Sequence, residues 1–264
     1  MEPTTVVYLY CVVKSVRRPM AHRVPSGLPG GTTPEVISLA RGQWLVTSDV
    51  PLDVYGPGRL DDRLRDLEWV AEIAVAHESV VEHFARVKGA TAVPLKLFTM
   101  FSSRERAIDD LAGRRTALNT VMRRVAGCEE WGIRVTRSSP APVLGRGART
   151  EKAASPNSGT AFLAARRDAR DAARAARESA AGAAEGAYSR LTRLARDSRL
   201  RDRPPEGGTN PPILEAAFLV PVTGRARFKA EAKRQAAACT AAGADMTLTG
   251  PWPAYSFVSL EALS

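Results

Sequence analysis

The chain has few of the residues on which common catalytic and metal sites depend. Its 264 residues include 3 cysteines and 3 histidines. Cys11, Cys128 and Cys239 are far apart in the sequence and form no C-x-x-C pair, which is typical of reduced thiols in a cytoplasmic protein. No G-x-S-x-G, G-x-G-x-x-G or G-K-[ST] motif is present. With few bases available to activate a nucleophile, we expect no catalytic residues, no cofactor and no enzyme activity.

Long hydrophobic runs are also missing. No stretch approaches the roughly 18 apolar residues that a membrane-spanning helix needs. The opening MEPTTVVYLYCVV has no basic residue before its short apolar part and no small-residue cleavage site after it. It therefore predicts a first strand and not a signal peptide. We expect a cytoplasmic protein that does not associate with membranes.

Positive charge is in excess, and the formal net charge is +10. Arginines dominate the stretch ARRDARDAARAARE at residues 165–178, where acids alternate with them and no aromatic residue occurs. Nucleic-acid binders tend to gather charge on one face and to add stacking aromatics. The pattern favours a solvated helix with salt bridges between its side chains. The second interpretation is a surface that binds an acidic protein or a membrane, and the third is a surface that binds nucleic acid.

The first hundred residues predict a ferredoxin-like domain at residues 1–101. A Pro/Gly-rich loop at residues 19–34 takes the place of the first helix in the βαββαβ plan. The remaining elements are a strand at 6–13, a hairpin at 35–50 that turns at Arg41-Gly42, a helix at 60–84 and a strand at 90–98.

Residues 102–264 predict a second α+β domain that carries a long Ala-rich helical insertion. Ser103 can cap a helix that runs to about residue 125, and a strand follows at 131–137. Residues 138–159 have the composition of a linker. A helical arm is expected at 160–198, as one helix or as two joined near Gly182 and Gly186, and the expected strand, helix and strand after it lie at 213–222, 225–242 and 246–248.

The arm has a seam of small residues at helical spacing. Such spacing allows close approach of a second helix, as in a helical hairpin or a coiled coil. Burying mostly alanine yields little apolar area, so the arm is expected to be marginally stable without a partner. The seam consists of Ala165, Ala169, Ala172, Ala176, Ala180, Ala183, Ala187, Leu191 and Leu194.

One cluster of histidines and glutamates resembles a set of metal ligands. The stretch AHESVVEH contains His77, Glu78, Glu82 and His83. A zinc-binding H-E-x-x-H motif has its histidines four residues apart on one helix face, and His77 and His83 are not spaced in that way. We therefore expect no metal site and interpret His77 as a histidine at the edge of the core.

The segment TGPWPAYSF near the C-terminus is rich in aromatics. Pro251 and Pro253 favour extended backbone, and alternation would put Trp252 on one face with Tyr255 and Phe257 on the other. The segment predicts a stiff closing strand of the C-terminal sheet. A groove for a partner or ligand is the alternative.

Several separated stretches together resemble the gas vesicle accessory family GvpL/GvpF. The similarity implies a modified ferredoxin-like N-terminal domain, an α+β C-terminal domain with helices, and a non-enzymatic role as a minor component or assembly factor of gas vesicles. The stretches are VYLYCVV, DLEWVAEIAVAHESVVEH, TAVPLKLFTMF, SGTAFL and TGPWPAYSF.

The chain departs from the family pattern shortly after Pro94. The family often has Leu-Arg-Phe-Gly-Thr there, whereas this chain has Leu-Lys-Leu-Phe-Thr. Phe98 thus replaces the glycine, and a glycine turn is lost.

The resemblance also implies partners and a location. The expected partners are the hydrophobic main gas vesicle shell protein and other accessory proteins, and the expected location is the gas vesicle. Exposed sheet edges, the Ala-rich arm and the aromatic tail are the candidate contact surfaces. A basic adapter that binds nucleic acid or an acidic partner through the Arg-rich helix is the alternative function. The candidate partner-binding residues are Trp252, Tyr255, Phe257, Arg166, Arg170 and Arg174.

Overall fold

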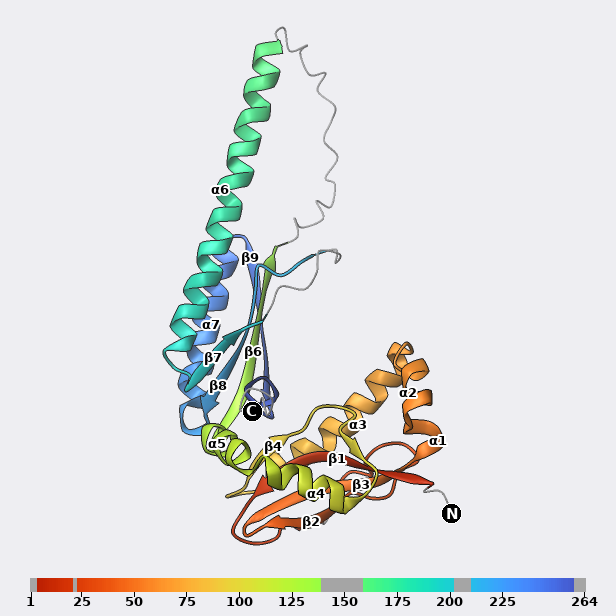
Figure 1. Ribbon diagram of the computed structural model, residues 1–264. Helices are drawn as coiled ribbons and strands as arrows, with labels where there is room; N and C mark the ends of the chain where they lie inside the picture. Colours follow the sequence, from red (N-terminus) through yellow and green to blue (C-terminus); the bar gives the residue numbers. More distant parts are fainter. Residues whose placement is uncertain (1–3, 21–22, 139–158, 202–209, 259–264) are drawn as a thin grey trace. The chain divides into compact units, whose positions relative to one another are not determined.

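The structure, a computed structural model, describes residues 4–20, 23–138, 159–201 and 210–258 (Figure 1). The chain divides into two compact units. One comprises Met1–Glu130 with Pro251–Ser264, and the other comprises Trp131–Gly250. This division differs from the boundary expected after residue 101, because the two helices that follow that residue belong to the first unit.

The first unit is built on an antiparallel sheet. Its strands are β1 (Thr5–Lys14), β2 (Glu35–Ala40), β3 (Gln43–Pro51), β4 (Thr91–Pro94) and β5 (Met100–Phe101). Their order is β2-β3-β1-β4, and β5 also pairs with β1. This is the order of the ferredoxin-like plan, so the expected fold class is confirmed. β1 is central and buried throughout its middle, which explains its uninterrupted apolar sequence.

The expected loop and hairpin are both present. No helix occurs among the described residues between β1 and β2. The loop is nevertheless packed, since the backbone N–H of Leu28 donates to the Tyr10 hydroxyl at 3.1 Å. Gly27 has φ +79° there, and a Cβ would lie 2.6 Å from the same hydroxyl. β2 and β3 form the hairpin, with Gly42 at positive φ in the turn.

The helix expected at residues 60–84 is broken into separate pieces. The pieces are α2 (Pro57–Arg63) and α3 (Leu67–Ala85), and another short helix, α1 (Leu52–Tyr55), comes before them. The break occurs because the Asp66 carboxylate accepts hydrogen bonds from the backbone N–H groups of Glu68 and Trp69, both at 3.1 Å, and so caps a new helix. The apolar spacing predicted α3 correctly, but it did not show where the helix begins.

The strand expected at residues 90–98 ends at Pro94. The N–H of the next residue, Leu95, still donates to the Tyr10 carbonyl at 2.9 Å before the chain leaves β1. The chain then turns, and Phe98 takes a left-handed conformation with φ +61° at the position where the family often has glycine. Its ring stacks on Trp69 with the ring centroids 5.8 Å apart.

Two helices extend the first unit beyond the expected boundary. They are α4 (Arg104–Gly113) and α5 (Arg115–Val125), and Ser103 caps the first, as expected. Arg104 forms ion pairs with Glu35 and Asp49 at 2.5 and 2.9 Å. These contacts with β2 and β3 hold the helices to the first sheet.

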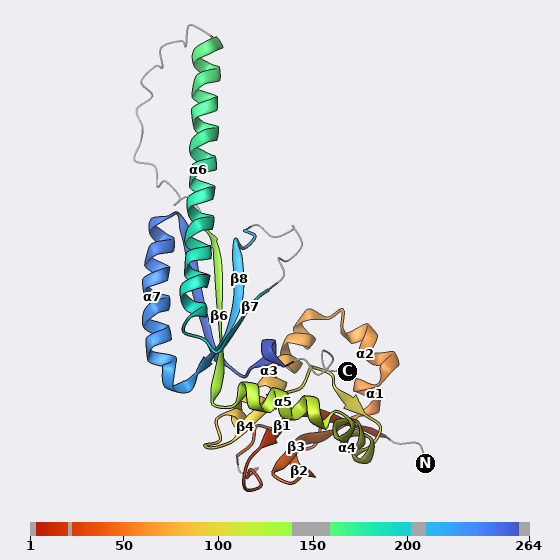
Figure 2. The same ribbon diagram turned by 60° about the vertical axis from the view of Figure 1, so that its left-hand side comes forward.

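The second unit repeats the strand order of the first. Its elements are β6 (Cys128–Arg137), α6 (Gly159–Thr192), β7 (Asp197–Leu200), β8 (Leu214–Pro221), a short 3-10 turn η1 (Val222–Gly224), α7 (Arg225–Ala241) and β9 (Ala244–Trp252). The sheet order is β7-β8-β6-β9. Both helices of the βαββαβ plan are present, and they lie on one face of the sheet (Figures 1 and 2). α6 is therefore the elongated first helix of this plan.

The expected arm forms one continuous helix that stops earlier than residue 198. α6 runs through Gly182 and Gly186 and ends at Thr192, and the following residues form β7. The expected linker at 138–159 lies almost entirely outside the described residues.

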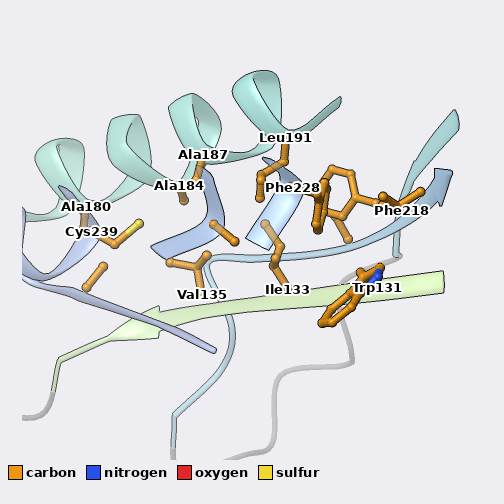
Figure 3. Packing of buried hydrophobic residues seen from close by; sticks show 14 residues of the cluster. Trp131, Ile133, Val135, Ala180, Ala184, Ala187, Leu191, Phe218, Phe228 and Cys239 are labelled. Carbon is orange, nitrogen blue, oxygen red and sulfur yellow. The ribbon is translucent and has the colours of Figure 1, made fainter. Parts of the chain in front are cut away.

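The core of the second unit uses only part of the alanine seam. Ala180, Ala187 and Leu191 of the predicted seam are buried together with Ala184, whereas the predicted Ala183 is only partly buried. Figure 3 shows the four buried residues facing β6 and the aromatic pair Phe218 and Phe228. All residues from 162 to 179 are exposed. The seam therefore packs over its C-terminal part alone, because the helix runs past the end of its sheet (Figure 2).

Candidate functional surface

The histidine cluster of α3 is divided between the core and the surface. His77 is buried, and its Nδ1 is hydrogen-bonded to the Tyr8 hydroxyl at 2.7 Å. Its ring also stacks on Tyr10, with the centroids 5.6 Å apart. Burial lowers the pKa of His77 to about 4, so the imidazole is neutral near pH 7. It serves as a packing and hydrogen-bonding residue, as the sequence indicated.

Two other members of that cluster, Glu82 and His83, have separate partners. Glu82 forms an ion pair with Arg86 at 2.5 Å, and the His83 ring contacts the edge of Phe84. Across the described ranges, no group of three histidine, cysteine, aspartate or glutamate side chains is placed to hold a metal ion. The arrangement offers packing and surface charge, with no set of converging ligands in the part that the structure describes.

The aromatic tail follows the expected strand only as far as Trp252. That residue ends β9, and its side chain is 42% exposed. Tyr255–Phe257 then form a 3-10 turn, η2, stabilised by a hydrogen bond from the Phe257 N–H to the Ala254 carbonyl at 3.1 Å. The expected alternation of Tyr255 and Phe257 along a closing strand is therefore wrong, because Pro253 interrupts the ladder and a turn follows it.

The turn is anchored in the first unit by contacts that sequence patterns did not reveal. The backbone N–H and the hydroxyl of Ser256 donate to the two carboxylate oxygens of Glu130 at 2.7 and 2.6 Å. Phe257 is fully buried, and the Arg124 guanidinium lies 5.8 Å from its ring centroid. Of the three tail aromatics expected to contact a partner, Trp252 is the most exposed, and Phe257 is fixed in the core.

The three candidate arginines are exposed on α6. Arg166, Arg170 and Arg174 all lie in the portion that extends past the sheet, residues 162–179, hereafter the distal segment. Phe162 and Leu163 at its start are 61% and 63% exposed. Large apolar side chains on a helix that no described element covers are typical of a surface that meets another molecule. The arginines and the tail aromatics belong to different units, so they do not form one described site.

One outer strand of each sheet is poorly suited to pairing with another chain. β2 is an outer strand of the first sheet, and the Arg18 guanidinium donates to its Val36 carbonyl at 2.5 Å. β7, at an edge of the second sheet, has only four residues. Short edges and edges whose backbone groups are engaged are poor templates for strand addition. The distal segment, where Phe162 and Leu163 are exposed, is the candidate surface. No helix among the described residues has the length and apolar character needed to cross a membrane.

Comparison with known proteins agrees with the resemblance found in the sequence. The sequence model of the family described as "Gas vesicle synthesis protein GvpL/GvpF" matches residues 6–259. Gas vesicle protein L from Streptomyces sp. (strain CB03234) is 29% identical over 262 residues, which cover 94% of this chain and 92% of that protein.

Two solved structures share the fold. The crystal structure of the gas vesicle protein GvpF from Anabaena sp. PCC7120 matches with a TM-score of 0.65 and 16% identity, over 97% of this chain and 96% of that one. GvpF from Microcystis aeruginosa matches with a TM-score of 0.61 and 14% identity, over 96% and 98% of the two chains. Since the family model spans nearly the whole sequence, the chain belongs to the GvpL/GvpF family of gas vesicle proteins.

Proposed function

We propose that this gas vesicle accessory protein assists assembly of the vesicle shell in the cytoplasm without catalysing a reaction. In this role it binds the hydrophobic main shell protein and other accessory proteins. The observation that carries the proposal is the distal segment of α6, which is exposed at every position from 162 to 179. Family membership supports the gas vesicle role, and the distal segment supplies a surface that the described residues of its own unit leave uncovered.

A physical need for such a partner follows from the chemistry of a hydrophobic shell subunit. Before incorporation, its apolar faces and strand edges would aggregate with other copies. A partner that covers these faces reduces that hazard. Burying the side chains of Phe162 and Leu163 against the subunit would contribute about 1.5–3 kcal/mol each. These contacts are apolar, so salt would not screen them.

Co-purification tests this proposal. The chain and the main shell protein are expressed together, captured through a tag on this chain, and washed at low and high salt. We expect the shell protein to remain bound at high salt. The double variant Phe162→Ala/Leu163→Ala should lose the shell protein.

A matched control removes two exposed apolar side chains elsewhere. Leu67 and Val75 on α3 are 80% and 66% exposed, so Leu67→Ala/Val75→Ala removes comparable surface from the other unit. It should retain the shell protein. Equal loss in both double variants, or no capture by the unaltered chain, would count against the proposed contact.

A further inference from the structure

The charges of the distal segment are sorted by face. α6 buries Ala180, Ala184 and Ala187 on one stripe, and the same stripe continues along the exposed part of the helix. Phe162 stands about five turns before Ala180, on the same face at 3.6 residues per turn. Ala169, Ala173 and Ala176 fall on this stripe between them.

A row of arginines borders this stripe on one side. Arg166, Arg170 and Arg177 fall within about 40° of arc on a helix of 3.6 residues per turn. In the part of the chain that the structure describes, none of the three forms an ion pair. Arg166 and Arg170 are four residues apart, where like charges repel each other on a helix surface.

The remaining arginines of the segment, Arg167 and Arg174, lie farther around the helix from the stripe, beyond this row, and are paired. Arg174 donates to Glu178 at 2.8 Å, and Arg167 lies 4.0 Å from Asp171. The ion-pair ladder that the sequence predicted therefore exists, but only on this back face. The face with Phe162 and the alanines has positive charge beside it and no acid to balance it.

We propose that the distal segment binds an amphipathic helix of a partner protein whose apolar stripe is bordered by aspartates or glutamates. The alanines allow the backbone of a second helix to approach closely, Phe162 supplies apolar area, and carboxylates on the partner would neutralise Arg166, Arg170 and Arg177. This inference rests on the proposed function and extends it, since it names the chemistry of the partner helix that the distal segment binds.

A helix fits this surface better than nucleic acid does. The segment 162–179 has five arginines but also two aspartates and one glutamate. These acids would repel phosphates, and Phe162 is the single aromatic residue available for stacking on bases. Charge beside an apolar stripe sets orientation and partner choice more than total affinity, so the apolar contacts remain at high salt and the charges select the partner.

Binding of synthetic helices to the full chain tests this inference. The first probe is a labelled amphipathic peptide with an Ala/Leu stripe bordered by glutamates. The second is the same peptide with lysines in place of those glutamates, and the third is a short DNA duplex. Two variants with equal net charge are compared: Arg166→Glu/Arg170→Glu on the bordering row and Arg167→Glu/Arg174→Glu on the back face. Circular dichroism verifies that both keep their helix content.

The expected results are specific to the bordering row. The glutamate peptide should bind about tenfold more weakly to R166E/R170E at moderate salt and within about twofold of normal to R167E/R174E. The lysine peptide should bind R166E/R170E more tightly than it binds the unaltered chain. This reversal of peptide preference requires direct charge pairing between the peptide and residues 166 and 170.

Three binding results would overturn the inference. They are equal weakening by both variants, tighter binding of DNA than of the glutamate peptide, and no binding of that peptide to the unaltered chain at micromolar concentration. A dimer of the chain that blocks the peptide would also overturn it, in favour of a second copy as the occupant. If the peptide fails while the shell protein is still captured through Phe162 and Leu163, the inference alone is lost. If the peptide binds but the shell protein is not captured, the proposed function is lost instead.

Discussion

Lowering the pH from 7 to 5 should destabilise the first unit through protonation of His77. Burial lowers the pKa of this residue in the folded chain from 6.5 to about 4. As the pH falls below 6.5, His77 therefore binds a proton in the unfolded state but stays unprotonated in the folded state. The stabilisation from keeping His77 neutral is complete above pH 6.5 and is lost progressively as the pH falls toward 4.

The size of this loss follows from the two pKa values. With 6.5 for the unfolded chain and about 4 for the folded chain, the free energy of unfolding should fall by about 2 kcal/mol between pH 7 and pH 5. Glu78 acts in the opposite direction, because burial raises its pKa and its protonation favours the folded state. The contribution of His77 must therefore be isolated by comparison with a variant.

His77→Gln is the suitable variant, since glutamine can still hydrogen-bond to the Tyr8 hydroxyl but does not titrate. Urea unfolding at pH 7 and pH 5 gives the free energies, and hydrogen exchange of the β1 amides assigns the change to the first unit. The variant should lose about 2 kcal/mol less than the natural chain between the two pH values. His83→Gln, on the same helix but partly exposed, is the control and should behave like the natural chain. Parallel losses in the natural chain and His77→Gln would refute the reasoning.

Three further predictions concern backbone and core positions. Gly182→Ala should stabilise the second unit by about 1 kcal/mol, because this glycine lies inside α6 and a Cβ there would meet nothing within 4 Å. Gly132→Ala should destabilise the same unit, because its Cβ would lie 2.8 Å from Thr249 Oγ1. Thermal unfolding measures both changes. In urea unfolding, Phe98→Gly should be more stable than Phe98→Ala by about 1 kcal/mol, because both variants lose the ring but only glycine adopts the positive φ without strain. The reverse order of stability would contradict backbone strain at residue 98. Phe257→Ala should destabilise the first unit by about 3–5 kcal/mol and accelerate amide hydrogen exchange there. Faster exchange in the second unit alone would contradict the packing of Phe257 in the first unit.

The sequence alone determined those features that depend on residues close together in the chain. The hairpin needed only two β-rich runs and a turn at Gly42, and Ser103 identified the start of α4 by its capping role. The apolar run of β1 predicted a buried strand. The family resemblance rested on several short stretches in a fixed order, so it was also available from the sequence.

The tertiary structure decided which parts of the chain belong together. Ser256 binds Glu130 across 126 residues, and Arg104 binds Glu35 across 69, so no local pattern could assign the tail or α4 to the first unit. The alanine seam likewise looks uniform in sequence, but only its C-terminal part has a sheet beneath it. Helical periodicity shows that a face is apolar, whereas the length of the sheet determines how much of that face is covered. The exposure of the distal segment, with its arginine row and Phe162, is therefore a product of the fold in the described part of the chain.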